Sequence, residues 1–147
     1  MAITASGLYG LTIEKMLIDT AAESLEAEDN LGILVADGYT HAYDTHDFVN
    51  DLTNELTDGD YAREAVTATE LTISSGVLVF DAADQDYGAA VTLTAAMAQV
   101  LATETGASDA ARMLVCLQDF VTAATSTAGQ FTVQHSASGI FRLDFTP

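Results

Sequence analysis

The stretch that decides the fold is Gly129-Gln-Phe-Thr-Val-Gln-His-Ser-Ala-Ser-Gly-Ile-Phe-Arg-Leu-Asp-Phe145. Apolar and polar residues alternate on both sides of a Ser136–Gly139 turn, in which Gly139 supplies the positive φ that such turns often need. Side chains alternate across a β-strand, so the pattern predicts two half-buried strands joined as a hairpin that closes a β-rich domain. The apolar phase comprises Phe131, Val133, His135, Phe141, Leu143 and Phe145.

Several shorter runs upstream also predict strands. Leu31–Ala36 is an apolar run that ends at Asp37-Gly38, which indicates a buried strand followed by a turn. Gly76–Phe80 is apolar on both faces, as a central strand would be, and Ser74–Gly76 before it predicts a hairpin turn. Further strands are expected at Val66–Ile73, Val91–Thr94 and Arg112–Asp119, with loops at Asp81–Gly88 and Thr122–Ala128.

One segment gives conflicting signals. Ala95–Glu104 is rich in Ala, Met, Gln and Leu, which favour helix, but it lies between two predicted strands. Both assignments stay open.

Two helices are expected. Apolar residues at helical spacing predict the first over about 7–19, after an uncharged arm at residues 1–7, and propensity would extend it through the acidic segment 21–30. Asp44 or Thr45 is a suitable N-cap for a second, short helix near residues 45–53, anchored by Phe48 and Leu52. We therefore predict one mainly β (α+β) domain over residues 1–147, either an antiparallel β-sandwich or a partly closed barrel.

Charge limits the classes of partner. The chain of 147 residues carries 22 acidic and 4 basic side chains, a net charge of −18. Nucleic acids and anionic membranes are bound by neutralising phosphates, so we expect neither as a partner and expect a charged partner to be basic. An apolar content of 49% in periodic runs indicates a folded core. Without a predicted signal peptide or spanning segment, synthesis in a cytoplasm is expected.

Candidate chemistry is sparse. Cys116 is the only thiol and lies in an apolar strand, where a buried packing role is expected. His135 falls in the apolar phase of its strand, and His46 is expected to bond to a neighbouring loop rather than act as a base. His41 and His46 with Asp44 and Asp47 have the residue types of a metal site, but two histidines five apart do not share a helical face.

The acidic loop at 81–88 leaves calcium binding open. Asp81, Asp84 and Asp86 followed by Gly88 have the density of a calcium loop, but their spacing is not that of an EF-hand. We predict no enzyme activity, no cofactor and no metal, while a small metal-binding or hydrolytic module is kept as a less favoured alternative.

Taken together, several segments resemble small structural proteins of tailed bacteriophages. They are Asp44-Thr-His-Asp-Phe48, Asn54-Glu55, the Tyr61 turn, Gly76-Val-Leu-Val-Phe-Asp81-Ala-Ala-Asp84, Leu114 with Phe120, and Phe131-Thr-Val-Gln-His-Ser-Ala-Ser-Gly-Ile-Phe-Arg-Leu143. The resemblance runs from about Leu8 to Leu143. It implies a β-rich domain of the virion that binds an assembled shell or tail, without catalytic residues.

The expected function is therefore that of a head decoration or minor capsid protein that binds the major capsid protein or other virion proteins. A place in the tail or at the head–tail connection is the alternative. A homo-oligomer is expected, with a trimer suggested only by lattice symmetry. The candidate contact residues are Ile3, Leu8, Tyr9, Leu11 and Phe48.

Overall fold

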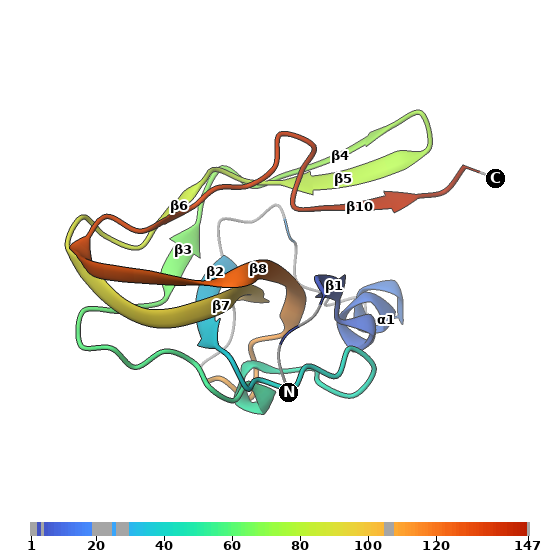
Figure 1. Cartoon of the computed structure of the whole chain (residues 1–147). Coiled ribbons are helices and arrows are strands. Elements are labelled where there is room, and N and C mark those ends of the chain that lie inside the picture. The colour runs from blue at the N-terminus through green and yellow to red at the C-terminus, as the bar shows by residue number, and fades with distance from the viewer. Residues whose placement is uncertain (1–2, 4, 19–24, 26–29, 105–107, 147) are drawn as a thin grey trace.

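The computed structural model describes residues 3, 5–18, 25, 30–104 and 108–146 (Figure 1). It confirms the mainly β fold: antiparallel sheets are stacked in layers, with one short helix, α1 (Gly10–Ile18), near the N-terminus. The described strands form no closed barrel. The second helix near residues 45–53 reduces to a single 3₁₀ turn, Val49–Asp51.

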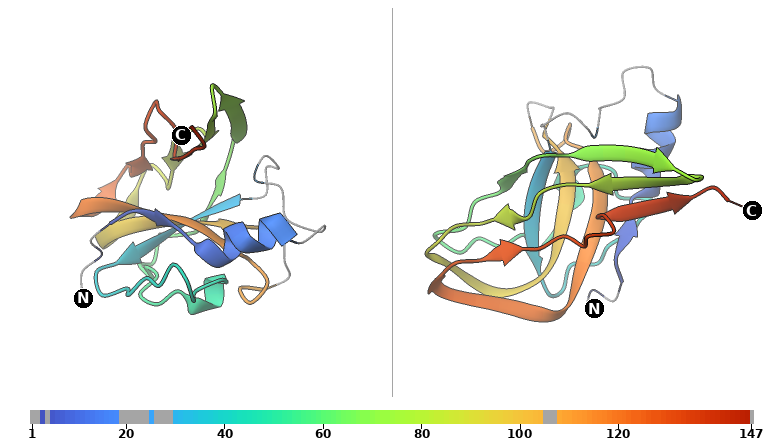
Figure 2. Two further views of the ribbon diagram at one scale, coloured as in Figure 1. Left: turned by 90° about the vertical axis from the view of Figure 1, so that its right-hand side faces the viewer. Right: turned by 90° about the horizontal axis from the view of Figure 1, so that it is seen from above.

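The largest sheet has five strands in the order β1-β8-β7-β2-β3. Above it lie a three-stranded sheet in the order β10-β5-β4 and the β6–β9 pair. Figure 2 shows the three-stranded sheet crossing over β2, β7 and β8. The strands are β1 (Gly7–Leu8), β2 (Asn30–Ala36), β3 (Glu64–Val66), β4 (Glu70–Ser74), β5 (Val77–Asp81), β6 (Gln85–Asp86), β7 (Val91–Thr103), β8 (Leu114–Gly129), β9 (Thr132–Val133) and β10 (Phe141–Asp144).

The central part of the five-stranded sheet is buried on both faces. One face packs on the loops after β2, where Ile33, Val100 and Leu117 meet Tyr39 and Val49. The other face packs under the smaller sheets, in two further clusters, one of them around Leu34 and Leu93 and the other around Phe80, Leu101 and Cys116. Burial on both faces explains why β2, the middle of β7 and the start of β8 are continuously apolar.

The conflicting segment Ala95–Glu104 is strand: β7 runs without a break from Val91 to Thr103. Helix propensity is overridden because β2 and β8 pair with this segment from both sides. Ala95 has a φ of 57° and lies where the register between β7 and β8 shifts, so the strand passes the ambiguous point through a bulge.

The predicted loop Thr122–Ala128 is also strand, and this expectation was wrong. β8 continues to Gly129, with Leu93 opposite Ser126 and Ala96 opposite Ala124. Small polar residues gave no alternating signal, but β7 supplies the backbone partners that keep them extended.

The prediction that the two C-terminal strands pair with each other is wrong, although the turn between them is confirmed. Gly139 has a φ of 92° and its N–H donates to the Ser136 carbonyl at 2.8 Å. The strands on either side belong to different sheets, because β9 pairs with β6 and β10 pairs with β5. The predicted hairpin turn at Ser74–Gly76 does join β4 to β5, with φ values of 51° at Ser75 and 79° at Gly76.

The described part of the N-terminal arm lies against the body. Ile3 is buried, Ala5 accepts a hydrogen bond from the Tyr43 hydroxyl at 2.8 Å, and Ser6 accepts one from the Asp119 N–H at 2.8 Å. The predicted helix begins at Gly10 rather than at residue 7, because Gly7 and Leu8 pair with β8. The expectation for the acidic segment 21–30 falls mostly outside the described residues.

A buried polar group joins the five-stranded sheet to the β6–β9 pair. The Gln99 amide on β7 donates to Gln85 Oε1 and, at 2.7 Å, to the Tyr87 hydroxyl, and Gln85 donates to the Glu64 carbonyl at 3.0 Å. Gly32 of β2 lies beneath them: a Cβ there would stand 2.5 Å from both Gln85 Oε1 and the Tyr87 oxygen. The layers can approach because this position has no side chain.

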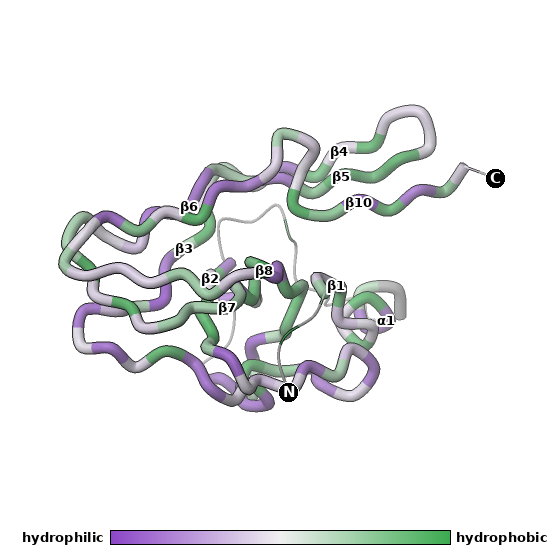
Figure 3. The backbone as a smooth tube through the Cα atoms, in the orientation of Figure 1, coloured by the Kyte–Doolittle hydropathy of each residue, from purple (hydrophilic) through white to green (hydrophobic). Residues whose placement is uncertain are grey.

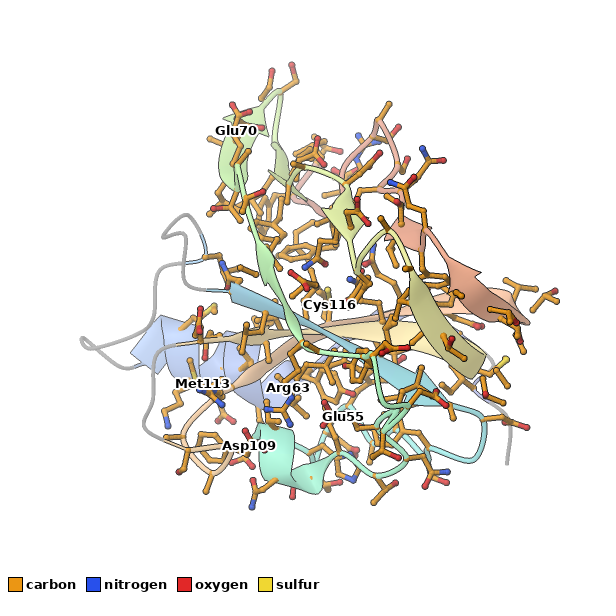
Figure 4. The ribbon with its side chains drawn as sticks, turned by 90° about the vertical axis from the view of Figure 1, so that its left-hand side faces the viewer. Glu55, Arg63, Glu70, Asp109, Met113 and Cys116 are labelled. Atoms are coloured by element: carbon orange, nitrogen blue, oxygen red, sulfur yellow. The ribbon has the colours of Figure 1, made fainter. Side chains whose placement is uncertain are left out.

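A second polar cluster fastens two loops. Arg63 donates to both carboxylate oxygens of Glu55 at 2.8 and 2.7 Å and to both of Asp109 at 2.7 and 3.0 Å. Figure 4 shows Arg63, Glu55 and Asp109. Arg112 adds a bond to Asp109 at 3.0 Å, so two of the four cations share this carboxylate. The Arg63 guanidinium lowers the pKa of Asp109 and the Glu55 carboxylate raises that of Arg63.

Gly32→Ala should destabilise the fold by about 1–3 kcal/mol, because the added methyl group overpacks a buried polar network. Gly59→Ala is the matched control, since no atom lies within 4 Å of the Cβ position there. Urea unfolding of both variants measures the difference. Equal stability of the two would contradict the close approach of the layers.

Arg63→Met should lower the free energy of unfolding by about 2 kcal/mol near neutral pH, because it leaves charge-assisted hydrogen bonds of two carboxylates unmade. The folded pKa of Asp109 is depressed, so its contribution is present above the unfolded pKa of about 3.9 and is lost as the pH falls through the folded value. The gap between wild type and variant should therefore narrow in acid. Arg142→Met, on exposed β10, controls for the lost cation; an equal loss there would show that net charge alone is responsible.

Candidate binding surface

Of the five predicted contact residues, two are core residues. Ile3 is 3% exposed and Tyr9 is fully buried, with its hydroxyl 2.8 Å from that of Tyr39, so neither can face a partner in this fold. Leu8 and Leu11 are half-buried, and Leu8 packs beneath the three-stranded sheet. Phe48 is half-buried under the Lys15 ammonium, which lies 5.1 Å from the ring centre. The five do not form one exposed surface.

His46 is held by a hydrogen bond inside the fold. His46 Nδ1 lies 3.0 Å from the Tyr39 hydroxyl, which confirms the expected bond to a neighbouring loop and completes a Tyr9–Tyr39–His46 chain. Desolvation raises the pKa of both Tyr9 and Tyr39, so both hydroxyl groups stay protonated at neutral pH. The carboxylate of Asp51 accepts the N–H groups of Asp47 and Phe48.

The acidic loop directs its carboxylates to separate donors. Asp81 accepts from the Ala82 N–H at 2.9 Å, Asp84 from the His135 N–H at 2.9 Å, and Asp86 from the Gly88 N–H at 3.0 Å. They stabilise local turns and hold β9 against β6. Among the described residues, no group of three or more His, Cys, Asp or Glu side chains is placed to hold a metal ion.

The only thiol is not paired with a base. Cys116 is 3% exposed in the centre of the molecule, and burial raises its pKa to about 12, so it stays protonated (Figure 4). His135 is half-buried with Nδ1 3.3 Å from the Gln118 amide, and desolvation lowers its pKa. Cys116 thus packs in the core, and His135 contacts Gln118.

The most distinctive surface feature is the outer half of the three-stranded sheet, which projects beyond the layers below it (Figure 1). In its inner half, Leu71, Phe80 and Phe141 lie opposite one another and pack in the core. Two residues further along each strand, on the same face, stand Ile73, Leu78 and Leu143.

This apolar row reaches solvent. Ile73 is 69% exposed and Phe145, the next residue of the same phase, is 62% exposed, while Leu78 and Leu143 are half-buried. Figure 3 shows the apolar segments that run out along β5 and β10. Single exposed apolar residues are common, but a cross-strand row continuous with the core is typical of a binding surface. We name Ile73, Leu78, Leu143 and Phe145 the apolar overhang.

The opposite face of the same sheet is mixed. Val77 and Val79 lie in its central strand, and charged residues flank them: Glu70, Asp81, Arg142 and Asp144. An open hollow of about 380 Å³, lined in part by Val79, lies there beside the Ser136–Gly139 turn. The sheet therefore separates an apolar face from one that carries three acidic side chains.

Sequence reasoning missed the apolar overhang, although the alternation that reveals it was recognised. Phe141, Leu143 and Phe145 were assigned together to the core, whereas only the inner part of the row has a layer beneath it. How far a sheet extends beyond the layer that covers it is decided by the packing of distant segments, so the local sequence pattern does not reveal it.

Comparison with known proteins gives no match: no family model, no curated protein and no solved structure resembles the chain closely enough to count. Within the described residues, no helix has the length and apolar content needed to cross a membrane.

Proposed function

We propose that this chain is a non-enzymatic structural protein of a tailed-bacteriophage particle, which decorates the head by binding the assembled capsid through the apolar overhang. The observation that carries the binding role is the row Ile73–Leu78–Leu143 with Phe145, which continues the core into solvent on a projecting sheet. Burying two large side chains of this kind contributes about 1.5–3 kcal/mol each.

The place on a phage particle rests on the resemblance of Asp44–Phe48, Gly76–Asp84 and Phe131–Leu143 to small virion proteins. A repeating capsid lattice suits a modest surface of this kind, because many weak contacts act together. A position in the tail or at the head–tail connection uses the same surface and is the competing assignment.

The charge of the chain defines the partner further. Glu70, Asp81 and Asp144 lie on the reverse face of the strands that carry the apolar overhang, so a capsid surface that is apolar at the contact and basic beyond its edge would be complementary. The major capsid protein is the proposed partner. Binding of this kind weakens as salt screens the attraction.

Replacing both Ile73 and Phe145 with serine should weaken binding to capsids that lack this protein by about tenfold or more, because exposed apolar area no longer becomes buried. Co-sedimentation with those capsids measures the loss. Thr72→Ala and Arg142→Ser, on the opposite face of the same strands, should bind nearly as wild type.

Unchanged binding of the double variant would contradict the role of the apolar overhang. Shearing off the tails separates the two particle assignments: protein that stays with the heads supports decoration, and protein that leaves with the tails supports the alternative.

A further inference from the structure

Two long stretches of this acidic chain carry no charge. Residues 87–103 and 120–141 contain no Asp, Glu, Lys or Arg, although 22 acidic residues are distributed over the rest of the sequence. The structure brings the two stretches together, since they supply β7, most of β8, and β9.

 The titratable side chains of these two stretches are Tyr87 and His135. Both are mostly uncharged at pH 7, because the ordinary pKa of tyrosine is about 10 and that of histidine about 6.5.

The second observation is that β8 has an open edge. In the order β1-β8-β7-β2-β3, β1 covers only Cys116 and Leu117 on the outer side of β8. From there to Gly129, no described strand pairs with that side. Between Val121 and Ala128, whose φ values are 65° and 47°, the six residues Thr122–Thr127 form an extended segment, and most of their side chains are exposed.

The other edge strands of the described sheets carry a charged side chain or are only two residues long. Charges lie on β3 (Glu64), β4 (Glu70), β6 (Asp86) and β10 (Arg142 and Asp144), whereas the uncharged β1 and β9 have two residues each. Charged side chains are a common device against edge-to-edge pairing. The edge of β8 over Thr122–Thr127 has no such charge, is longer than β1 or β9, and is paired with no described strand on its outer side.

We propose that the β8 edge over Thr122–Thr127 is a self-association surface, which pairs antiparallel with the same edge of a second copy of this chain. Copies that each carry a net charge of −18 repel one another, so they approach closely only where a surface is uncharged. A basic partner would instead gain most at the acidic faces. Antiparallel pairing of one edge with itself has two-fold symmetry and closes after two chains.

The nearest carboxylates mark the limits of this surface. Asp119 precedes the segment and holds the Val121 N–H at 2.7 Å, and Asp86 holds the Gln130 amide at 3.0 Å beyond its other end. Asp58 bonds to Thr94 of β7, on the side of β8 that is already paired. None of the three lies within Thr122–Thr127, so repulsion between two copies is smallest along this segment.

Sedimentation velocity of the full chain tests the proposal. The wild type should form a dimer that strengthens as salt is raised, because salt screens the repulsion between two acidic chains. Ala123→Lys and Thr127→Glu each place a charge on the edge, and we expect each to weaken the dimer by about tenfold or more. Ala137→Lys, at an exposed alanine in the Ser136–Gly139 turn, is the control and should leave the dimer intact.

Two results would overturn the proposal: a wild type that stays monomeric at high concentration and high salt, or a dimer that both edge variants leave unchanged. Circular dichroism shows whether the variants remain folded. The Ile73 and Phe145 serine variant should still dimerise, so failure of the edge proposal and failure of the capsid-binding proposal are separable.

Discussion

The pairing of β7 with β8 in a sheet buried on both faces is the constraint on which the other features depend. Leu101 and Cys116 face the three-stranded sheet, while Val100 and Leu117 face the loops that follow β2. Desolvating a charge on either face would cost several kcal/mol, so this part of the chain is uncharged and the carboxylates lie around it. The smaller sheets and the N-terminal segment are then held by what they bury against these two strands.

The scarcity of cations is the second constraint. Arg63 and Arg112 both bind Asp109, and Arg63 also binds Glu55, so half of the positive charge fastens one pair of loops. Several other carboxylates in the described part of the chain accept backbone N–H groups. An acidic surface of this kind disfavours contact with another acidic surface. We therefore propose contacts at the two surfaces that lack acidic side chains, the apolar overhang and the edge of β8 over Thr122–Thr127.

Sequence patterns predicted the positions of strands and turns better than they predicted which strands pair with each other. The strand at Leu31–Ala36 and the turns at Ser74–Gly76 and Ser136–Gly139 follow from local chemistry, and each is confirmed. The turn before β10 could not reveal that its two strands join different sheets, because pairing is decided by distant segments. Tyr9 could equally have been core or contact, and only the packing shows that it is core.

We propose that the chain binds an assembled particle with its apolar overhang. Density from electron cryo-microscopy of the particle, at a resolution sufficient to orient a sheet, tests it most directly. We predict density for this chain on the head, with the side of β4, β5 and β10 that bears Ile73 and Phe145 against the shell. Density that placed this side toward solvent, or particles that lacked the chain, would contradict the claim.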